Sequence, residues 1–131
     1  MGKYLDNAKK LRNEVPCNCA QAVLLSFEEL LPVERSEAVA IGSNFGGGMK
    51  IGTVCGAITG GIMVMGLLGC SNAKALFDKV KANHQGLINC KDLLEVNDAK
   101  GGTRKAHCDG MIFESVEIVE NILRENGIIK D

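Results

Sequence analysis

The sequence predicts an all-α fold: a compact, single-domain bundle of about five or six helices around a central, glycine-rich apolar helix. Apolar residues recur at helical spacing along most of the chain, and the alternating β-branched runs typical of strands are absent. Proline, which interrupts helices, occurs only twice. The 131 residues contain no internal repeat and no linker-like stretch, so residues 1–131 are expected to form one domain, long enough to fold without disulfide bonds.

Capping and proline signals delimit the helices expected in the first third of the chain. A first short helix near residues 3–13 stops before Pro16, because the residue before a proline resists the helical conformation. A second helix is expected over about 18–31, where Asn18 caps its beginning and Pro32 follows its end. A third, near 34–44, leads into the glycine-rich loop NFGGGMKIG.

The central helix is predicted over about 52–69, within 19 consecutive uncharged residues at positions 51–69. That length approaches what a membrane span needs, but six of these residues are glycine, and aromatic anchors at the interface are missing. Glycine recurs every four residues at positions 48, 52, 56 and 60, which gives a smooth stripe for close helix approach. We therefore expect a buried central helix and no membrane insertion.

Two helical stretches are expected in the rest of the chain. The first covers about residues 72–96, with an interruption around Gly86, and the loop NDAKGGTRKAH follows it. The last helix covers about 108–126 and ends at Asn126 and Gly127, a typical C-terminal signal.

Charge and cysteine content narrow the function classes. The 15 Lys and Arg residues against 16 Asp and Glu residues leave no basic excess, so nucleic acid is not expected as a partner. The charged N-terminal segment lacks the apolar core of a secretory signal, which favours a reducing, cytoplasmic setting. There, six cysteines are more typical of metal binding or redox chemistry than of structural disulfides.

Four cysteines from four segments are expected to point toward the core. Helical geometry places Cys19, Cys90 and Cys108 on the apolar faces of their helices, and Cys55 belongs to the core helix by composition. Cys19 and Cys108 also fall in the first turn of their predicted helices, where free N–H groups and the helix dipole favour a thiolate. The glycine-rich loop before Cys55 can donate backbone N–H groups to an anion, including the sulfurs of a metal cluster.

Other interpretations of these residues stay open. A single buried cysteine is most simply a small core residue, whereas four on inward faces favour a shared metal or redox site. The sequence contains no CxxC pair and no CxxCH, which argues against a zinc ribbon, a thioredoxin-type site and covalent haem. Cys17 is interpreted as a loop residue, with a resolving thiol as the alternative, and Cys70 as structural. His84 and His107 are candidate ligands, although solvated histidines are the simpler interpretation.

The motifs around the four cysteines resemble those of a known family. They are, in order, NCAQAV with Cys19, FGGGM, CGAITG with Cys55, INCKDLL with Cys90, and HC with Cys108. Over about residues 15–125 the chain resembles the C-GCAxxG-C-C family of redox-active proteins. A related cysteine domain in split-Soret cytochromes is associated with an iron–sulfur centre. The resemblance implies a redox role with these four cysteines as ligands and a separate redox partner protein, and it leaves Cys17 and Cys70 outside the family's four.

Three hypotheses follow for the chemistry. The first is an electron-transfer protein that binds an iron–sulfur cluster through Cys19, Cys55, Cys90 and Cys108. Four thiolates suit a 2Fe–2S or a 4Fe–4S cluster, and 2Fe–2S is the first choice. The alternative is a thiol–disulfide oxidoreductase or redox sensor that uses the same cysteines without metal. A structural zinc site with the same ligands is the third hypothesis.

Overall fold

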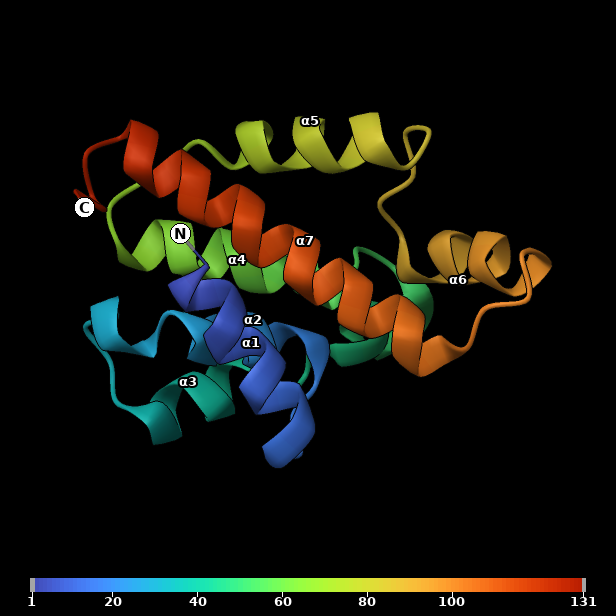
Figure 1. Ribbon diagram of the computed structural model, residues 1–131, viewed down its shortest axis with the longest axis horizontal. Coiled ribbons are helices and arrows are strands. Elements are labelled where there is room, and N and C mark those ends of the chain that lie inside the picture. Colours follow the sequence, from blue (N-terminus) through green and yellow to red (C-terminus); the bar gives the residue numbers. More distant parts are fainter. Residues whose placement is uncertain (1, 131) are drawn as a thin grey trace.

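The computed structural model describes residues 2–130 and confirms the all-α class (Figure 1). Its seven α-helices are α1 (Lys3–Glu14), α2 (Cys19–Ser26), α3 (Arg35–Gly42), α4 (Gly56–Leu67), α5 (Ala73–Asn83), α6 (Cys90–Ala99) and α7 (Arg104–Glu125). Two short helical turns, η1 (Glu28–Leu30) and η2 (Gly48–Gly52), lie between them. Within this range no strand forms, and one isolated antiparallel bridge joins Val54 to Asn89. Met1 and Asp131, the ends of the predicted domain, lie outside the described residues.

Helix α4 is the apolar centre of the bundle, as its composition predicts. It packs against α2, α5 and α7, and the long α7 crosses the middle of the molecule beside it (Figure 1). Gly60 allows α2 to approach closely, because a Cβ atom there would lie 2.7 Å from the carbonyl oxygen of Ala20. None of the helices within residues 2–130 combines the length and apolarity that crossing a membrane requires.

The predicted start of the central helix, at residue 52, is wrong. Helix α4 begins at Gly56, with Cys55 as its N-cap residue. Gly48 and Gly52 have φ angles of 65° and 77°, which turn the preceding loop and are incompatible with a right-handed helix. The four-residue glycine spacing therefore combines two separate functions, since the first two glycines shape a loop and the last two pack a helix.

The other predicted helices form, with adjusted ends. Asn18 caps α2 as expected and forms a capping box with Gln21, whereas the predicted segment 18–31 is divided at Phe27 into α2 and η1. The stretch 72–96 is two helices, α5 and α6, separated by a turn at Gly86 with a φ of 84°. This interruption raises the number of α-helices to seven.

Helix α7 begins at Arg104 rather than at residue 108. The side chain of Thr103 accepts a hydrogen bond from the N–H of Ala106 at 3.2 Å, and this cap adds a turn before Cys108. Helix α7 packs against α1, α2, α4, α5 and α6. Helix α7 therefore connects α1 and α2 to α5 and α6. Its first turns lie close to the residues at which α2, α4 and α6 begin.

Candidate functional site

The four predicted site cysteines line one cavity, although they come from four separate segments. The cavity has a volume of about 230 Å³. Its lining residues are Arg12, Cys17, Asn18, Cys19, Gly47, Cys55, Gly56, Cys90, Arg104, His107, Cys108 and Met111. The structure thus brings the four thiols together, while their role as ligands stays a prediction.

Three of the four thiols lie where helices begin. Cys19 is the first residue of α2, Cys90 is the first residue of α6, and Cys55 is the N-cap residue of α4. Cys108 is different, because it is the fifth residue of α7, which begins at Arg104. The prediction that Cys108 lies in a first helical turn is therefore wrong. Groups other than the beginning of the helix must lower the pKa of its thiol.

Cys55 is the most deeply buried of the four thiols, and its burial favours the neutral, protonated form. The Cys55 residue is 5% exposed, and burial raises the pKa of its thiol to about 11. The nearby backbone N–H groups of Ala57 and Ile58 lower the pKa of Cys55 and partly offset the burial. Burial, together with the neighbouring Cys108, also raises the pKa of Cys90. The cavity therefore holds weakly acidic thiols beside ready hydrogen-bond donors.

Cys19 and Cys108 form an asymmetric thiol pair. A hydrogen bond with Cys19, together with the positive charges of Arg104 and Arg12, outweighs burial and lowers the pKa of Cys108 to about 6. The same hydrogen bond and burial raise the pKa of Cys19. The two thiols therefore compete for one proton, and the nearby arginines favour the negative charge on Cys108.

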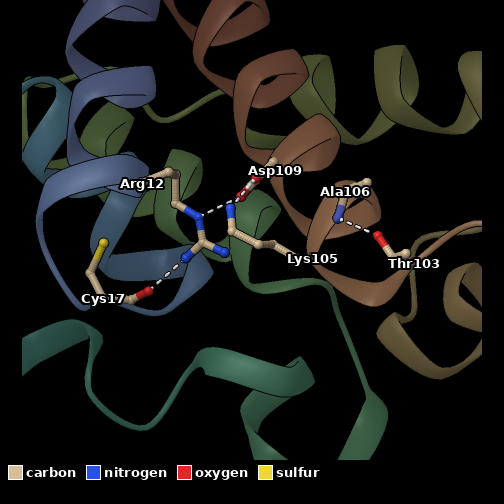
Figure 2. A network of polar contacts seen from close by, with 6 residues as sticks. All are labelled: Arg12, Cys17, Thr103, Lys105, Ala106 and Asp109. Carbon is tan, nitrogen blue, oxygen red and sulfur yellow. Dashed lines mark hydrogen bonds and ion pairs between the residues drawn. The ribbon is translucent and has the colours of Figure 1, made fainter.

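Arg12 connects three segments at the edge of the cavity (Figure 2). Its Nε donates to Asp109 Oδ1 at 2.6 Å, and its Nη1 donates to the carbonyl oxygen of Cys17 at 2.7 Å. Lys105 holds the other oxygen of Asp109 at 2.7 Å. Burial alone would raise the pKa of Asp109, but the hydrogen bonds from Lys105 and Arg12 hold it below its ordinary value. Helix α1 is thereby fixed to α7 and to the segment that carries Cys17 and Cys19.

Replacing Arg12 with glutamine is expected to lower the free energy of unfolding by about 2 kcal/mol, because hydrogen bonds to a charged group are lost. The Arg12 and Asp109 side chains are only 16% and 19% exposed, so water compensates poorly for the loss. Since the pKa of Asp109 is lowered in the folded protein, this contribution is present above about pH 4 and is lost as the pH falls through the folded-state pKa. Urea unfolding at pH 7 and pH 3 measures the difference.

The matched control is Lys105→Gln, which removes a 66% exposed partner from the same carboxylate. An exposed pair on one helix contributes about 0.5 kcal/mol, so this variant is expected to stay close to the parent protein. Equal losses from the two substitutions would contradict the role of Arg12 as the connecting residue.

Sequence reasoning missed Arg12, Arg104 and Met111 as residues of the cavity and gave Cys17 only an alternative role as a resolving thiol. Arg12 belongs to the helix predicted near residues 3–13 and Arg104 to a predicted loop, and no local pattern indicates that they face a thiol pocket. Cys17, interpreted as a loop residue with a resolving thiol as the alternative, also lines the cavity. Its position next to the capped start of α2, two residues from Cys19, is the signal that would have placed it there.

Of the other candidate residues, Cys70 and His84 lie outside the cavity and His107 lines it. Cys70 is buried and does not line the cavity, in agreement with a structural role. His107 lines the cavity, and burial together with His84 lowers its pKa. His84 instead pairs with Glu114 at 2.8 Å. Within residues 2–130, no group of three or more His, Cys, Asp or Glu side chains is arranged to hold a single metal ion.

A helical bundle that gathers four thiols from distant segments into one cavity defines a small protein of the clustered-cysteine, redox-active class. A family model described as "Putative redox-active protein (C_GCAxxG_C_C)" matches residues 17–122, and the chain belongs to this family. The match spans all four predicted site cysteines and confirms the resemblance of the motifs. No curated protein and no solved structure matches the chain.

Proposed function

We propose that this protein transfers electrons through an iron–sulfur cluster, with 2Fe–2S as the first choice, held by the thiolates of Cys19, Cys55, Cys90 and Cys108. The observation that carries the proposal is the convergence of these thiols, from α2, α4, α6 and α7, on one cavity of about 230 Å³. Membership of a redox-active family supports the same chemistry. All six cysteines are free thiols, in keeping with a reducing cytoplasmic setting.

The donor set suits a cluster better than a single ion. A structural zinc site needs its thiolates packed around one centre at about 2.3 Å from the metal. A cluster distributes its thiolates over two or more irons, so the sulfurs lie farther apart. Four thiols from four segments that line one cavity of about 230 Å³ fit the wider arrangement. Zinc is thus the weaker of the two metal hypotheses.

The chain's own residues supply the environment that such a cluster needs. The N–H groups of Ala57 and Ile58 lie near the Cys55 sulfur and lower its pKa, and N–H groups that donate to cluster sulfurs raise a reduction potential. Arg104 brings positive charge to the cavity, and the buried Met111 excludes water from its inner wall. When bound, the cluster would supply reversible one-electron chemistry.

Because the thiols must lose protons to bind iron, assembly of the cluster depends on pH. Burial raises the pKa of Cys55, and the hydrogen bond with Cys108 raises that of Cys19, so both thiols are protonated in the metal-free protein at neutral pH. Both must lose a proton to bind iron as thiolates, so iron binding releases protons and becomes stronger as the pH rises.

Protein expressed with added iron and purified without oxygen is expected to contain iron and acid-labile sulfide, and to show cluster absorbance and a reduced-state EPR signal. Each serine substitution at Cys19, Cys55, Cys90 or Cys108 is expected to lower the iron content about tenfold or more, because outer-shell changes alone lower metal affinity 10–100-fold. The matched control is Cys70→Ser, a buried cysteine away from the cavity, which is expected to retain iron. Iron-free protein after anaerobic purification and reconstitution would reject the proposal.

Thiol–disulfide exchange without metal is the second candidate, and the hydrogen-bonded pair of Cys19 and Cys108 favours it. The Cys108 thiolate would attack one sulfur of a substrate disulfide, form a mixed disulfide and release the first substrate thiolate. Cys19 would then give up its proton and attack the Cys108 sulfur, which releases the second thiol and leaves a Cys19–Cys108 disulfide. The protein is oxidised by two electrons, and the substrate disulfide is reduced by two.

Mass mapping after treatment with oxidised glutathione separates the two candidates. A reversible Cys19–Cys108 disulfide in an iron-free protein would favour exchange chemistry. Cluster-loaded protein whose four cysteines resist alkylation would favour electron transfer.

A further inference from the structure

The loop between α3 and α4 carries the most exposed large apolar side chain described. Ile51 is 76% exposed, and Met49, two residues before it, is 38% exposed. Isolated exposed apolar residues are common on protein surfaces, but two of them on one short turn beside a functional cavity call for a physical reason.

The backbone of this loop is held in a strained shape that keeps both side chains on the surface. Met49 and Lys50 have φ angles of 57° and 64°, a left-handed conformation that residues with a side chain rarely adopt. The carbonyl oxygen of Gly48 accepts hydrogen bonds from Thr53 N at 3.0 Å and from Thr53 Oγ1 at 2.8 Å, which closes the turn. Strain of this kind persists where the surrounding structure enforces it, and it is typical of functional sites.

The same loop covers one side of the thiol cavity. Gly47 lines the cavity, and a Cβ atom on Gly48 would lie 2.9 Å from Cys90 Cβ. The Cys90 N–H donates to the carbonyl oxygen of Thr53 at 2.7 Å. The exposed turn and a predicted ligand are therefore in direct contact, which provides a short path from the cavity to the surface.

Positive charges surround the apolar turn. Lys50 lies within it, a Cβ atom on Gly52 would lie 3.1 Å from Lys91 Cβ, and one on Gly47 would lie 3.9 Å from an Arg104 guanidinium nitrogen. All three cationic residues are exposed. No acidic residue occurs in the sequence between Glu37 and Asp78, so the loop itself carries no negative side chain.

We propose that Met49, Lys50, Ile51, Lys91 and Arg104, here named the glycine-loop surface, form the docking site for an acidic redox protein that exchanges electrons with the thiol cavity. An apolar centre with a cationic rim complements a partner whose apolar contact is surrounded by carboxylates. Redox encounters bury small interfaces, and a short exposed loop is the kind of surface that they use. The inference rests on the proposed redox function and adds the chemistry of the partner and its place of contact.

Binding is tested on the ¹⁵N-labelled full chain in metal-free, reduced form, so that the result does not depend on cluster loading. The probe is a plant-type ferredoxin chosen for its acidic surface, and a basic cytochrome c serves as the opposite probe. The acidic probe is expected to shift amide signals of residues 45–53 and of Lys91 and Arg104, and binding is expected to weaken steeply with salt. The basic probe is expected to leave these signals in place.

Two substitutions and two matched controls test the contribution of each group. Ile51→Ser and the pair Lys50→Glu with Lys91→Glu are each expected to raise the Kd for the acidic probe about tenfold. The controls are Ile41→Ser, which changes a 44% exposed isoleucine on α3, and Lys74→Glu with Lys79→Glu on α5. Both controls are expected to leave the Kd within about twofold.

Signals that shift elsewhere, no shift of the loop signals at low salt, or equal effects of variants and controls would overturn the docking proposal. Iron and sulfide analysis of separate anaerobic samples decides the proposed function on its own. A failed docking test in a protein that loads iron would thus remove the docking site and leave the electron-transfer assignment in place.

Discussion

Replacing Gly60 with valine is expected to lower the free energy of unfolding by about 3 kcal/mol, the upper part of the usual range for overpacking a core. Gly60 lies where α4 meets α2, and a Cβ atom there would lie 2.7 Å from Ala20 O and 3.0 Å from Ala20 Cα. Both are backbone atoms, so relief requires that α2 move as a whole. Because α2 carries Cys19 and α4 begins just after Cys55, the substitution is also expected to disturb the thiol cavity.

Gly66→Val is the matched control on the same helix, because a Cβ atom at Gly66 would meet nothing within 4 Å. Valine is a better helix former than glycine, so this variant is expected to equal the parent protein or to exceed it by about 0.5 kcal/mol. Urea and thermal unfolding measure both variants. If they lose the same stability, the close contact between α2 and α4 does not exist as described.

The second prediction concerns the pH dependence of Cys108 in the metal-free protein. The hydrogen bond from Cys19 and the charges of Arg104 and Arg12 lower the pKa of Cys108 to about 6. Only the thiolate is alkylated, so the rate of Cys108 modification by iodoacetamide is expected to rise with pH around a midpoint near that value and to level off above it. Peptide mass spectrometry after timed alkylation gives the profile for each cysteine separately.

Two comparisons make this pH profile specific. Cys55, whose pKa burial raises to about 11, is expected to show a midpoint far above that of Cys108. Cys19→Ser and Arg104→Gln are each expected to move the Cys108 midpoint to higher pH, because each removes or weakens a partner of the thiolate. The midpoint rather than the rate at neutral pH is the quantity to compare, since a more acidic thiol is also a weaker nucleophile. A Cys108 midpoint that both substitutions leave unchanged would reject this account of the pair.

The helical class and the inward placement of Cys19, Cys90 and Cys108 could be predicted from local periodicity, and the central position of residues 56–67 and of Cys55 from composition. An apolar face recurs every three to four residues whatever the helix contacts, so Cys19 and Cys90 could be assigned to the core from their own segments. The capping box at Asn18 is likewise local, since it involves residues three positions apart.

Features that depend on distant contacts could not be predicted. Arg12 meets Asp109 across 97 positions of the sequence, and nothing near either residue indicates the other. The predicted start of the central helix is too early because glycine is compatible with both a helix interior and a left-handed turn, and only the fold around Thr53 and Cys90 decides between them. The start of α7 was placed too late because the polar first turn, from Arg104 onward, lacks the apolar pattern that identifies a helix.

The gathering of three helix beginnings at the cavity has a consequence for its energetics. Each beginning carries roughly half an elementary positive charge that arises from aligned peptide groups and takes up or releases no proton. This positive charge does not titrate, so it favours the reduced, more negative state of a bound centre at every pH at which the protein is folded. The midpoint potential of any centre in the cavity should therefore contain a constant contribution from the main chain, and its variation with pH should report the side chains alone.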